Sequence, residues 1–150
     1  MATIRTEEET REIVALLGGK KVFRGKVSDA NGMQQALRKG LPFGAFEALL
    51  KALEVRSQEL AELLGVASRT LARRKSARHL SPIESDRLYR IAHITFLASE
   101  VLGSLEKARQ WLHKNNRALG GEPPITHLDT EIGERQVEEV LLRRSYGIYS

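Results

Sequence analysis

Apolar residues recur along the chain at intervals of three and four positions, the spacing of amphipathic helices. The first such segment predicts a helix that starts at Thr6, whose spacing to Glu9 fits a capping box, and stops at Gly18-Gly19. Residues 20–30 are mixed and predict a loop or a short extended piece. Two further helices are expected in the first third of the chain, over residues 32–39 and 42–53.

Capping signals define the helices of the remaining chain. Ser81-Pro82-Ile83-Glu84 combines an N-cap serine, a proline in the first turn and a glutamate at the third position, which predicts a long helix to about Leu102. No hairpin or βαβ pattern occurs, so the predicted fold class is all-α. The expected helices are 57–64, 68–76, 82–102, 105–112 and 131–144, with a Gly-, Pro- and Asn-rich loop over residues 115–128.

The segment SQELAELLGVASRTLARRKS, residues 57–76, has the spacing of a helix-turn-helix. Ala61 is the small residue expected where two helices cross, and Gly65 suits the positive φ of the turn. Leu60, Leu64, Val66 and Leu71 supply the apolar anchors. An ordinary αα-hairpin shares such spacings, but here the second helix is also strongly basic, which favours DNA binding.

One position departs from the usual pattern of this motif. Arg74 stands three residues after Leu71, where an apolar residue is common. A shorter or differently tilted second helix is therefore expected. Ser68 is predicted to cap this helix, and Arg69, Thr70 and Arg73 share its outward face and are expected at base edges. The predicted DNA-binding residues are Ser68, Arg69, Thr70, Arg73, Arg74, Lys75 and Arg78, of which the last three are expected on phosphates.

The charge distribution supports this assignment. The 150-residue chain carries a formal net charge of +5, and residues 51–80 alone account for +4. Residues 69–78 hold five Lys or Arg and no acidic residue, whereas residues 81–150 have a net charge of −1. A localised basic stretch of this kind is typical of a phosphate-binding surface, although many charge runs are only solvated faces.

Composition excludes several kinds of chemistry. The chain has no cysteine, so neither a disulfide framework nor a thiolate metal site is possible. The four histidines are too widely spaced for a metal-ligand pattern, and no phosphate-binding glycine loop is present. No enzyme activity, metal or cofactor is expected. With no signal-peptide pattern at the N-terminus and no apolar run of ~18 residues, a cytoplasmic location is expected.

The residues after the basic helix carry a more specific signal. They include Leu80-Ser81-Pro82, Glu84-Ser85-Asp86-Arg87-Leu88-Tyr89-Arg90, Glu100-Val101-Leu102-Gly103, Trp111-Leu112, Ala118-Leu119-Gly120-Gly121, Pro123-Pro124, Leu128-Asp129-Thr130, Gly133, Val137, Leu141 and Tyr146-Gly147. In order and spacing, residues 40–147 resemble the Xre/MbcA/ParS-like antitoxins of type II toxin–antitoxin systems whose toxins carry a RES domain. Trp111 is nevertheless expected mainly in the core.

The resemblance implies a function and a division of the chain. It implies an antitoxin that covers the active site of an NAD-consuming RES-domain toxin and represses its own operon by binding operator DNA. Since one helix-turn-helix reads few base pairs, a homodimer is expected, within a larger toxin–antitoxin complex. The implied regions are a variable segment (1–40), the helix-turn-helix region (41–97) and a toxin-binding region (98–150). A stand-alone transcriptional regulator with a C-terminal dimerisation region is the alternative.

The C-terminal tail is the expected toxin contact. Arginine and tyrosine are frequent at the centre of protein interfaces. The candidate toxin-binding residues are Arg143, Arg144, Tyr146, Ile148 and Tyr149. A plainer interpretation remains open, in which the two arginines complement the helix dipole and Tyr146 packs on the core.

Overall fold

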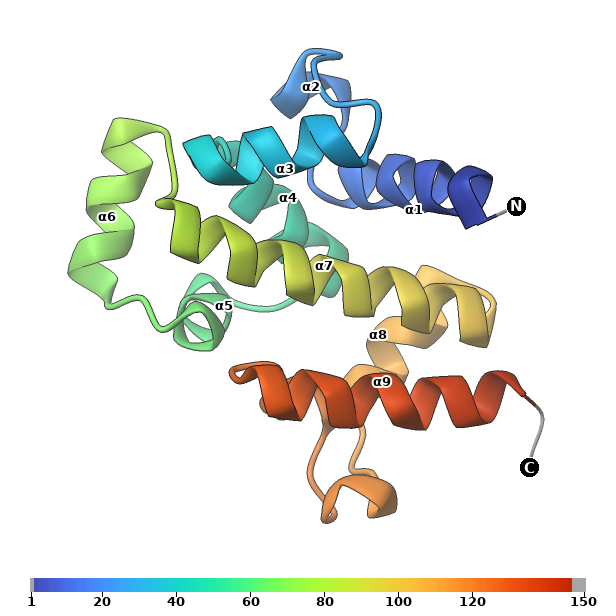
Figure 1. The fold of residues 1–150 in the computed structure, drawn as a ribbon. Helices are drawn as coiled ribbons and strands as arrows, with labels where there is room; N and C mark the ends of the chain where they lie inside the picture. Colours follow the sequence, from blue (N-terminus) through green and yellow to red (C-terminus); the bar gives the residue numbers. More distant parts are fainter. Residues whose placement is uncertain (1, 147–150) are drawn as a thin grey trace. The chain divides into compact units, whose positions relative to one another are not determined.

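The computed structural model describes the backbone of residues 2–146 and the side chains of residues 7–146. In this part of the chain the regular elements are all helical, which confirms the all-α class (Figure 1). The α-helices are α1 (Ala2–Leu16), α2 (Lys20–Phe23), α3 (Ala30–Lys39), α4 (Phe43–Leu53), α5 (Ser57–Leu64), α6 (Ser68–Ala77), α7 (Pro82–Leu102), α8 (Leu105–His113) and α9 (Glu131–Ser145), and the short 3-10 helices are η1 (Arg117–Leu119) and η2 (Pro124–His127).

Three predictions of local structure were wrong. Helix α1 begins at Ala2 rather than at Thr6, because no proline or glycine precedes Thr6 to stop it. The segment expected to be a loop or extended piece contains the single helical turn α2. Ser68 is the first residue of α6 rather than its cap. The N-cap is Ala67, which has no side-chain hydrogen bond to the helix.

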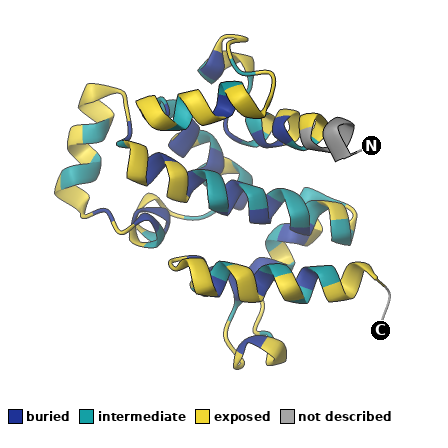
Figure 2. Cartoon of the chain, in the orientation of Figure 1, coloured by how far each residue is buried: buried dark blue, intermediate teal, exposed yellow. Residues whose placement is uncertain are grey.

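The chain forms two compact units, residues 1–92 and 93–150, and α7 contributes to both. The first unit buries aliphatic and aromatic side chains from α1, α3, α4, α5 and α7 (Figure 2). Phe43 and Phe46 contact each other there with ring centroids 5.3 Å apart. Because aromatic residues are few, most of the large side chains of this core are Leu and Ile: Ile13, Leu17, Leu41, Leu49, Leu53, Leu60, Leu64, Leu88 and Ile91.

The second unit is built around the loop between α8 and α9. Both short 3-10 helices lie in this loop, and α8 and α9 pack against η2. Its buried residues include Leu112, Leu119, Ile125, Val137 and Leu141. Trp111, which was expected in the core, is half-buried on α8.

Helix α7 is the longest helix of the described chain, yet no helix over the described residues is both long and apolar enough to be a candidate membrane span.

Candidate nucleic-acid interface and C-terminal partner surface

The turn between α5 and α6 has the geometry that the sequence predicts. Gly65 has φ of 70°, and its N–H donates to the Glu62 carbonyl at 3.0 Å. The next N–H, from Val66, donates to the Ala61 carbonyl at 2.9 Å. Leu60, Ala61, Leu64 and Val66 are buried around this turn. A left-handed glycine followed by a buried valine therefore redirects the chain into α6.

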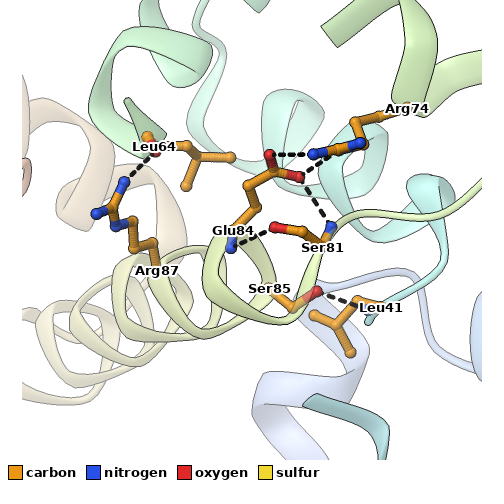
Figure 3. A network of polar contacts seen from close by, with 7 residues as sticks. All are labelled: Leu41, Leu64, Arg74, Ser81, Glu84, Ser85 and Arg87. Carbon is orange, nitrogen blue, oxygen red and sulfur yellow. Dashed lines mark hydrogen bonds and ion pairs between the residues drawn. The ribbon is translucent and has the colours of Figure 1, made fainter. Parts of the chain in front are cut away.

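The C-terminal end of α5 has a side-chain partner that the sequence did not reveal. Arg87 of α7 donates from Nη1 to the Leu64 carbonyl at 2.8 Å (Figure 3). A Cβ at position 65 would lie 2.8 Å from the same nitrogen. Gly65 is thus required for its backbone angle and also leaves space for the guanidinium.

Helix α6 is the most exposed helix of the motif. None of its residues is buried, and Figure 2 shows only exposed and intermediate positions along it. Arg69, Arg73 and Lys75 are exposed, as is Arg78 at its C-cap, whereas Thr70 is intermediate. Ser68 is exposed at the first position. Four cations therefore project from a helix that contributes no buried side chain.

Arg74 has an internal partner. Its Nε and Nη2 donate to the two carboxylate oxygens of Glu84, at 2.8 and 3.1 Å (Figure 3). Glu84 is 8% exposed, and it also accepts the Ser81 N–H at 2.8 Å while its own N–H donates to Ser81 Oγ at 3.2 Å. The predicted capping box at the start of α7 is thereby confirmed, and the same carboxylate anchors α6.

The electrostatics of this pair follow from its geometry. Burial alone would raise the pKa of Glu84, but the hydrogen bonds from Arg74 and Ser81, together with the positive charge of Arg74, lower that pKa below its ordinary value. The bond to Glu84 and its negative charge raise the pKa of Arg74. Both groups are therefore ionised at neutral pH. The apolar contact usual at this position of the motif is replaced by a bidentate ion pair.

The C-terminal end of α6 is fixed against the start of α4. Arg78 has φ of 66°, and its carbonyl accepts the Phe43 N–H at 2.9 Å. Beyond it, Leu80 donates its N–H to the Leu41 carbonyl at 2.9 Å. The Leu41 N–H in turn donates to the buried Ser85 Oγ at 2.7 Å (Figure 3). These bonds hold α6 at its end and add to the Arg74–Glu84 pair, since none of its side chains is fully buried.

The C-terminal unit positions α9 by its first turn. Thr130 caps the helix, and its Oγ1 accepts the Gly133 N–H at 3.0 Å. A Cβ on Gly133 would collide with the His127 carbonyl. The glycine thus allows the start of α9 to lie directly on η2.

The described part of the predicted toxin-binding tail is exposed. Arg143 and Arg144 occupy the last turn of α9, and Tyr146 follows it with 73% of its surface exposed. The interpretation in which Tyr146 packs on the core was therefore wrong. Ile132, near the start of α9, is similarly exposed at 74%. Ile148 and Tyr149 lie outside the described residues.

One group of side chains could approach a metal ion. The ligand atoms of His93, Glu134 and Glu138, all half-buried, lie within 4.8 Å of one another. Two ligands on one Zn²⁺ are only about 3.3 Å apart, given bonds of about 2.0–2.1 Å in a tetrahedron. Both His93 and Glu134 also have other interactions within the structure. The sequence could not show this group, because His93 is some forty residues from the glutamates.

Two protein-family models match consecutive stretches of the chain. Residues 33–93 match the antitoxin Xre-like helix-turn-helix domain, and residues 97–147 match the antitoxin Xre/MbcA/ParS C-terminal toxin-binding domain. With the exposed basic helix α6, they define the class of protein: a helix-turn-helix protein that carries a toxin-binding domain.

Curated relatives agree with these matches. An antitoxin Xre of Pseudomonas putida is 47% identical over 64 residues, which span 43% of this chain and 40% of that protein. The antitoxins Xre of Yersinia enterocolitica and Photorhabdus laumondii are 25% and 28% identical over 77% and 76% of this chain, and over 79% and 78% of their own lengths. The chain belongs to the Xre-type antitoxin family.

Three supporting residues were not predicted as part of the site. Glu84 was recognised only as a helix cap, and Ser85 and Arg87 only as part of the family pattern. A usable signal for Glu84 existed: Arg74 stands at an apolar position of the motif, and such an arginine needs a buried acceptor. The Leu41 and Leu64 backbone atoms that Ser85 and Arg87 contact are set by tertiary structure alone.

Proposed function

We propose that this protein is an antitoxin that binds operator DNA through α6 and neutralises a RES-domain, NAD-consuming toxin through its C-terminal unit. The proposal rests on one observation above all. A helix with no buried side chain carries four exposed cations, and it belongs to the same chain as a domain of toxin-binding type. Both activities are binding, and we assign no catalytic residue or cofactor to the chain.

On DNA, α6 occupies the major groove. Arg69, Thr70 and Arg73 contact base edges, since they share the outward face of the helix. Lys75 and Arg78 contact phosphates. Ser68 is the first residue of α6 and lies beside a phosphate in this arrangement. The N-cap residue Ala67 makes no side-chain hydrogen bond to the helix, so the N–H groups of the first turn are available to that phosphate.

We assign Arg74 a different role from the other cations. Its guanidinium is bound to the Glu84 carboxylate, so we infer that it sets the orientation of α6 rather than binding a phosphate. This replaces the expectation from sequence that Arg74 contacts DNA directly.

On the toxin, the last turn of α9 and the residues after it enter the active-site cleft. Arg143, Arg144 and Tyr146 are exposed there, and we include Ile148 and Tyr149 in the same contact. A cleft that acts through acidic groups suits a guanidinium, because arginine and carboxylate pair strongly. The antitoxin then acts as a homodimer that represses its own operon, alone or with the toxin bound.

DNA binding is tested on the promoter upstream of the protein's own gene. Binding of the wild type, Arg69→Ala/Arg73→Ala and Lys75→Ala to this promoter and to a random duplex is measured from 50 to 200 mM salt. The arginine pair is expected to reduce the preference for the promoter, and Lys75→Ala to weaken both complexes alike and lower the salt slope by about 0.9. An unchanged preference in the double variant would contradict the assignment of α6.

Toxin binding is tested by co-purification with a RES-domain protein encoded beside the gene. We expect a stable complex that Arg143→Ala/Arg144→Ala/Tyr146→Ala weakens, with promoter binding unchanged. A wild-type chain that binds the promoter but not the toxin would instead identify the stand-alone regulator.

A further inference from the structure

The N-terminal third of the chain contains a second basic region. The net charge of residues 1–50 does not reveal it, because acidic residues elsewhere in this segment offset its cations. Residues 1–50 have eight basic and six acidic groups. The structure separates them, because four of the acidic residues lie on α1, whereas residues 17–46 carry six cations and a single acid. That acid, Asp29, is engaged at the N-cap of α3, where it accepts the Gly32 N–H at 2.8 Å.

The six cations form what we call the flanking basic surface. All are exposed, and within the described chain no ion pair is recorded for any of them. The members are Lys20, Lys21, Arg24 and Lys26 from α2 and the loop after it, and Arg38 and Lys39 from the last turn of α3.

Close contacts link both parts of this surface to residues 40–44, which lie against the C-terminal end of α6. From Lys39 the chain passes through Gly40 to Pro42, which forms an isolated β-bridge with His79, the residue after Arg78. A Cβ on Gly40 would collide with the Leu80 carbonyl, so this approach is as close as backbones allow. Arg38 and Lys39 therefore lie beside the C-terminal end of α6.

Helix α2 contacts the first turn of α4, next to these residues. A Cβ on Gly44 would lie only 3.0 Å from Val22 Cγ2, so α2 rests on the first turn of α4. The neighbouring Phe43 N–H is bonded to the Arg78 carbonyl. Contacts of α2, of the segment after α3 and of the end of α6 thus all involve residues 40–44, at the start of α4. Figure 1 shows these helices in the same unit.

The chemistry of this surface fits the backbone of duplex DNA. Its aromatic neighbours Phe23, Phe43 and Phe46 are buried, so no ring is available to stack on an unpaired base. Of the described residues, the exposed large apolar ones are Ile83, Ile132 and Tyr146, none of which belongs to this region, so there is no apolar anchor for a membrane. Exposed cations near the end of the basic helix α6 are suited to binding phosphates.

We propose that the flanking basic surface binds phosphates of the operator duplex beyond the base pairs that α6 contacts. This inference rests on the proposed DNA binding by α6 and extends it. The six side chains add affinity that depends on salt and on duplex length but not on sequence. The N-terminal segment thereby gains a role as an extension of the DNA interface.

The test compares charge-removing variants in the full-length protein. One variant is Lys20→Gln/Lys21→Gln/Arg24→Gln/Lys26→Gln, and a second is Arg38→Gln/Lys39→Gln. The matched control removes four exposed cations from the C-terminal unit, as Lys107→Gln/Lys114→Gln/Arg117→Gln/Arg135→Gln. A charge-conserving variant, Lys20→Arg/Lys21→Arg/Arg24→Lys/Lys26→Arg, separates loss of charge from loss of fold.

Binding is measured by fluorescence anisotropy on promoter and random duplexes of 12 and 30 base pairs, from 50 to 200 mM salt. The salt slope on the 30-base-pair duplexes should fall by about 0.9 for each phosphate contact removed, equally for both sequences. The gain in affinity from 12 to 30 base pairs should shrink in both variants and stay in the control and the charge-conserving variant.

Slopes and length dependence equal to those of the control would overturn the proposal and leave DNA binding by α6 intact. A wild-type protein without salt-dependent DNA binding would overturn both. A loss of the same size in the charge-conserving variant would show that the region is structural and would equally reject the proposal.

Discussion

Arg74 on α6 and Glu84 on α7 form a bidentate ion pair with N–O distances of 2.8 and 3.1 Å. Helix α6 has no fully buried side chain, so this pair and the backbone bonds at Arg78 contribute to holding it in place. A buried carboxylate deprived of its only guanidinium partner is costly, which makes the pair sensitive to single substitutions.

The first prediction concerns coupling between these two residues. Arg74→Met and Glu84→Gln should each lower promoter affinity severalfold, because each leaves α6 less firmly oriented. The double variant should lose less than the product of the two effects, since the partners act as a unit. Promoter affinities from fluorescence anisotropy give one double-mutant cycle for this pair, and melting temperatures give a second.

A second ion pair serves as the control for that cycle. Arg135 and Glu131 on α9 are 3.2 Å apart and largely exposed, and such surface pairs contribute little. Arg135→Met and Glu131→Gln should be additive and leave DNA binding unchanged. Strictly additive effects of Arg74→Met and Glu84→Gln would show that their contact does not orient α6.

A second prediction is a specific acid sensitivity. The pKa of Glu84 in the folded protein lies below its ordinary value of 4.5, so the unfolded chain binds a proton first as the pH falls. The contribution of Glu84 is present above about pH 4.5 and is lost as the pH falls through the lower folded pKa. Between pH 7 and 3, the wild type should therefore lose melting temperature more steeply than Glu84→Gln.

Glu106→Gln is the control for the acid sensitivity, since Glu106 is an exposed acid in the first turn of α8. It should follow the wild-type pH profile. If Glu84→Gln also followed that profile, its carboxylate would not stabilise the fold by ionisation.

The third prediction separates the backbone of Arg78 from its charge. A left-handed φ of 66° favours glycine, so Arg78→Gly should raise the free energy of unfolding by about 0.5–1 kcal/mol. The same variant should weaken promoter binding, because it removes a phosphate contact. Arg78→Lys keeps the charge and the backbone strain, so it should behave like the wild type in both assays. If Arg78→Gly bound the promoter as tightly as the wild type, the proposed phosphate contact of Arg78 would be rejected.

Gly133 supplies a fourth prediction, in the C-terminal unit. Gly133→Ala directs a methyl group into the His127 carbonyl and should destabilise this unit by about 1–3 kcal/mol. Trp111, the single tryptophan, reports the unfolding of this unit by its fluorescence. The control Gln136→Ala, at an exposed position of the same helix, should unfold as the wild type does. Wild-type stability of Gly133→Ala would show that η2 can move to accept the methyl group.

The sequence predicted those features that depend on local chemistry. The Gly65 turn and the Ser81–Glu84 capping box are both set by residues within a few positions of one another. Ser68 was misassigned because serine favours a cap, yet Ala67 already has the extended backbone of a cap residue.

Features that join distant segments could not be predicted. The Leu41–Ser85 bond spans 44 positions, and the bridge between Pro42 and His79 joins the start of α4 to the end of α6 only after folding. Arg74 was therefore counted among free cations although its partner lies just ten residues away, across a change of direction of the chain. The toxin contact rests on family likeness and on the exposure of α9.

Neutralisation of an NAD-consuming toxin by the C-terminal unit, as proposed above, can be measured as the NAD level of the cell. Cells that express the neighbouring RES-domain protein are compared with and without this chain, and with its Arg143→Ala/Arg144→Ala/Tyr146→Ala variant at equal abundance. We expect the NAD level to collapse with the toxin alone, to be restored by the wild-type chain and to be restored poorly by the variant. NAD that stays depleted with the wild-type chain present at or above the abundance of the toxin would contradict the proposal.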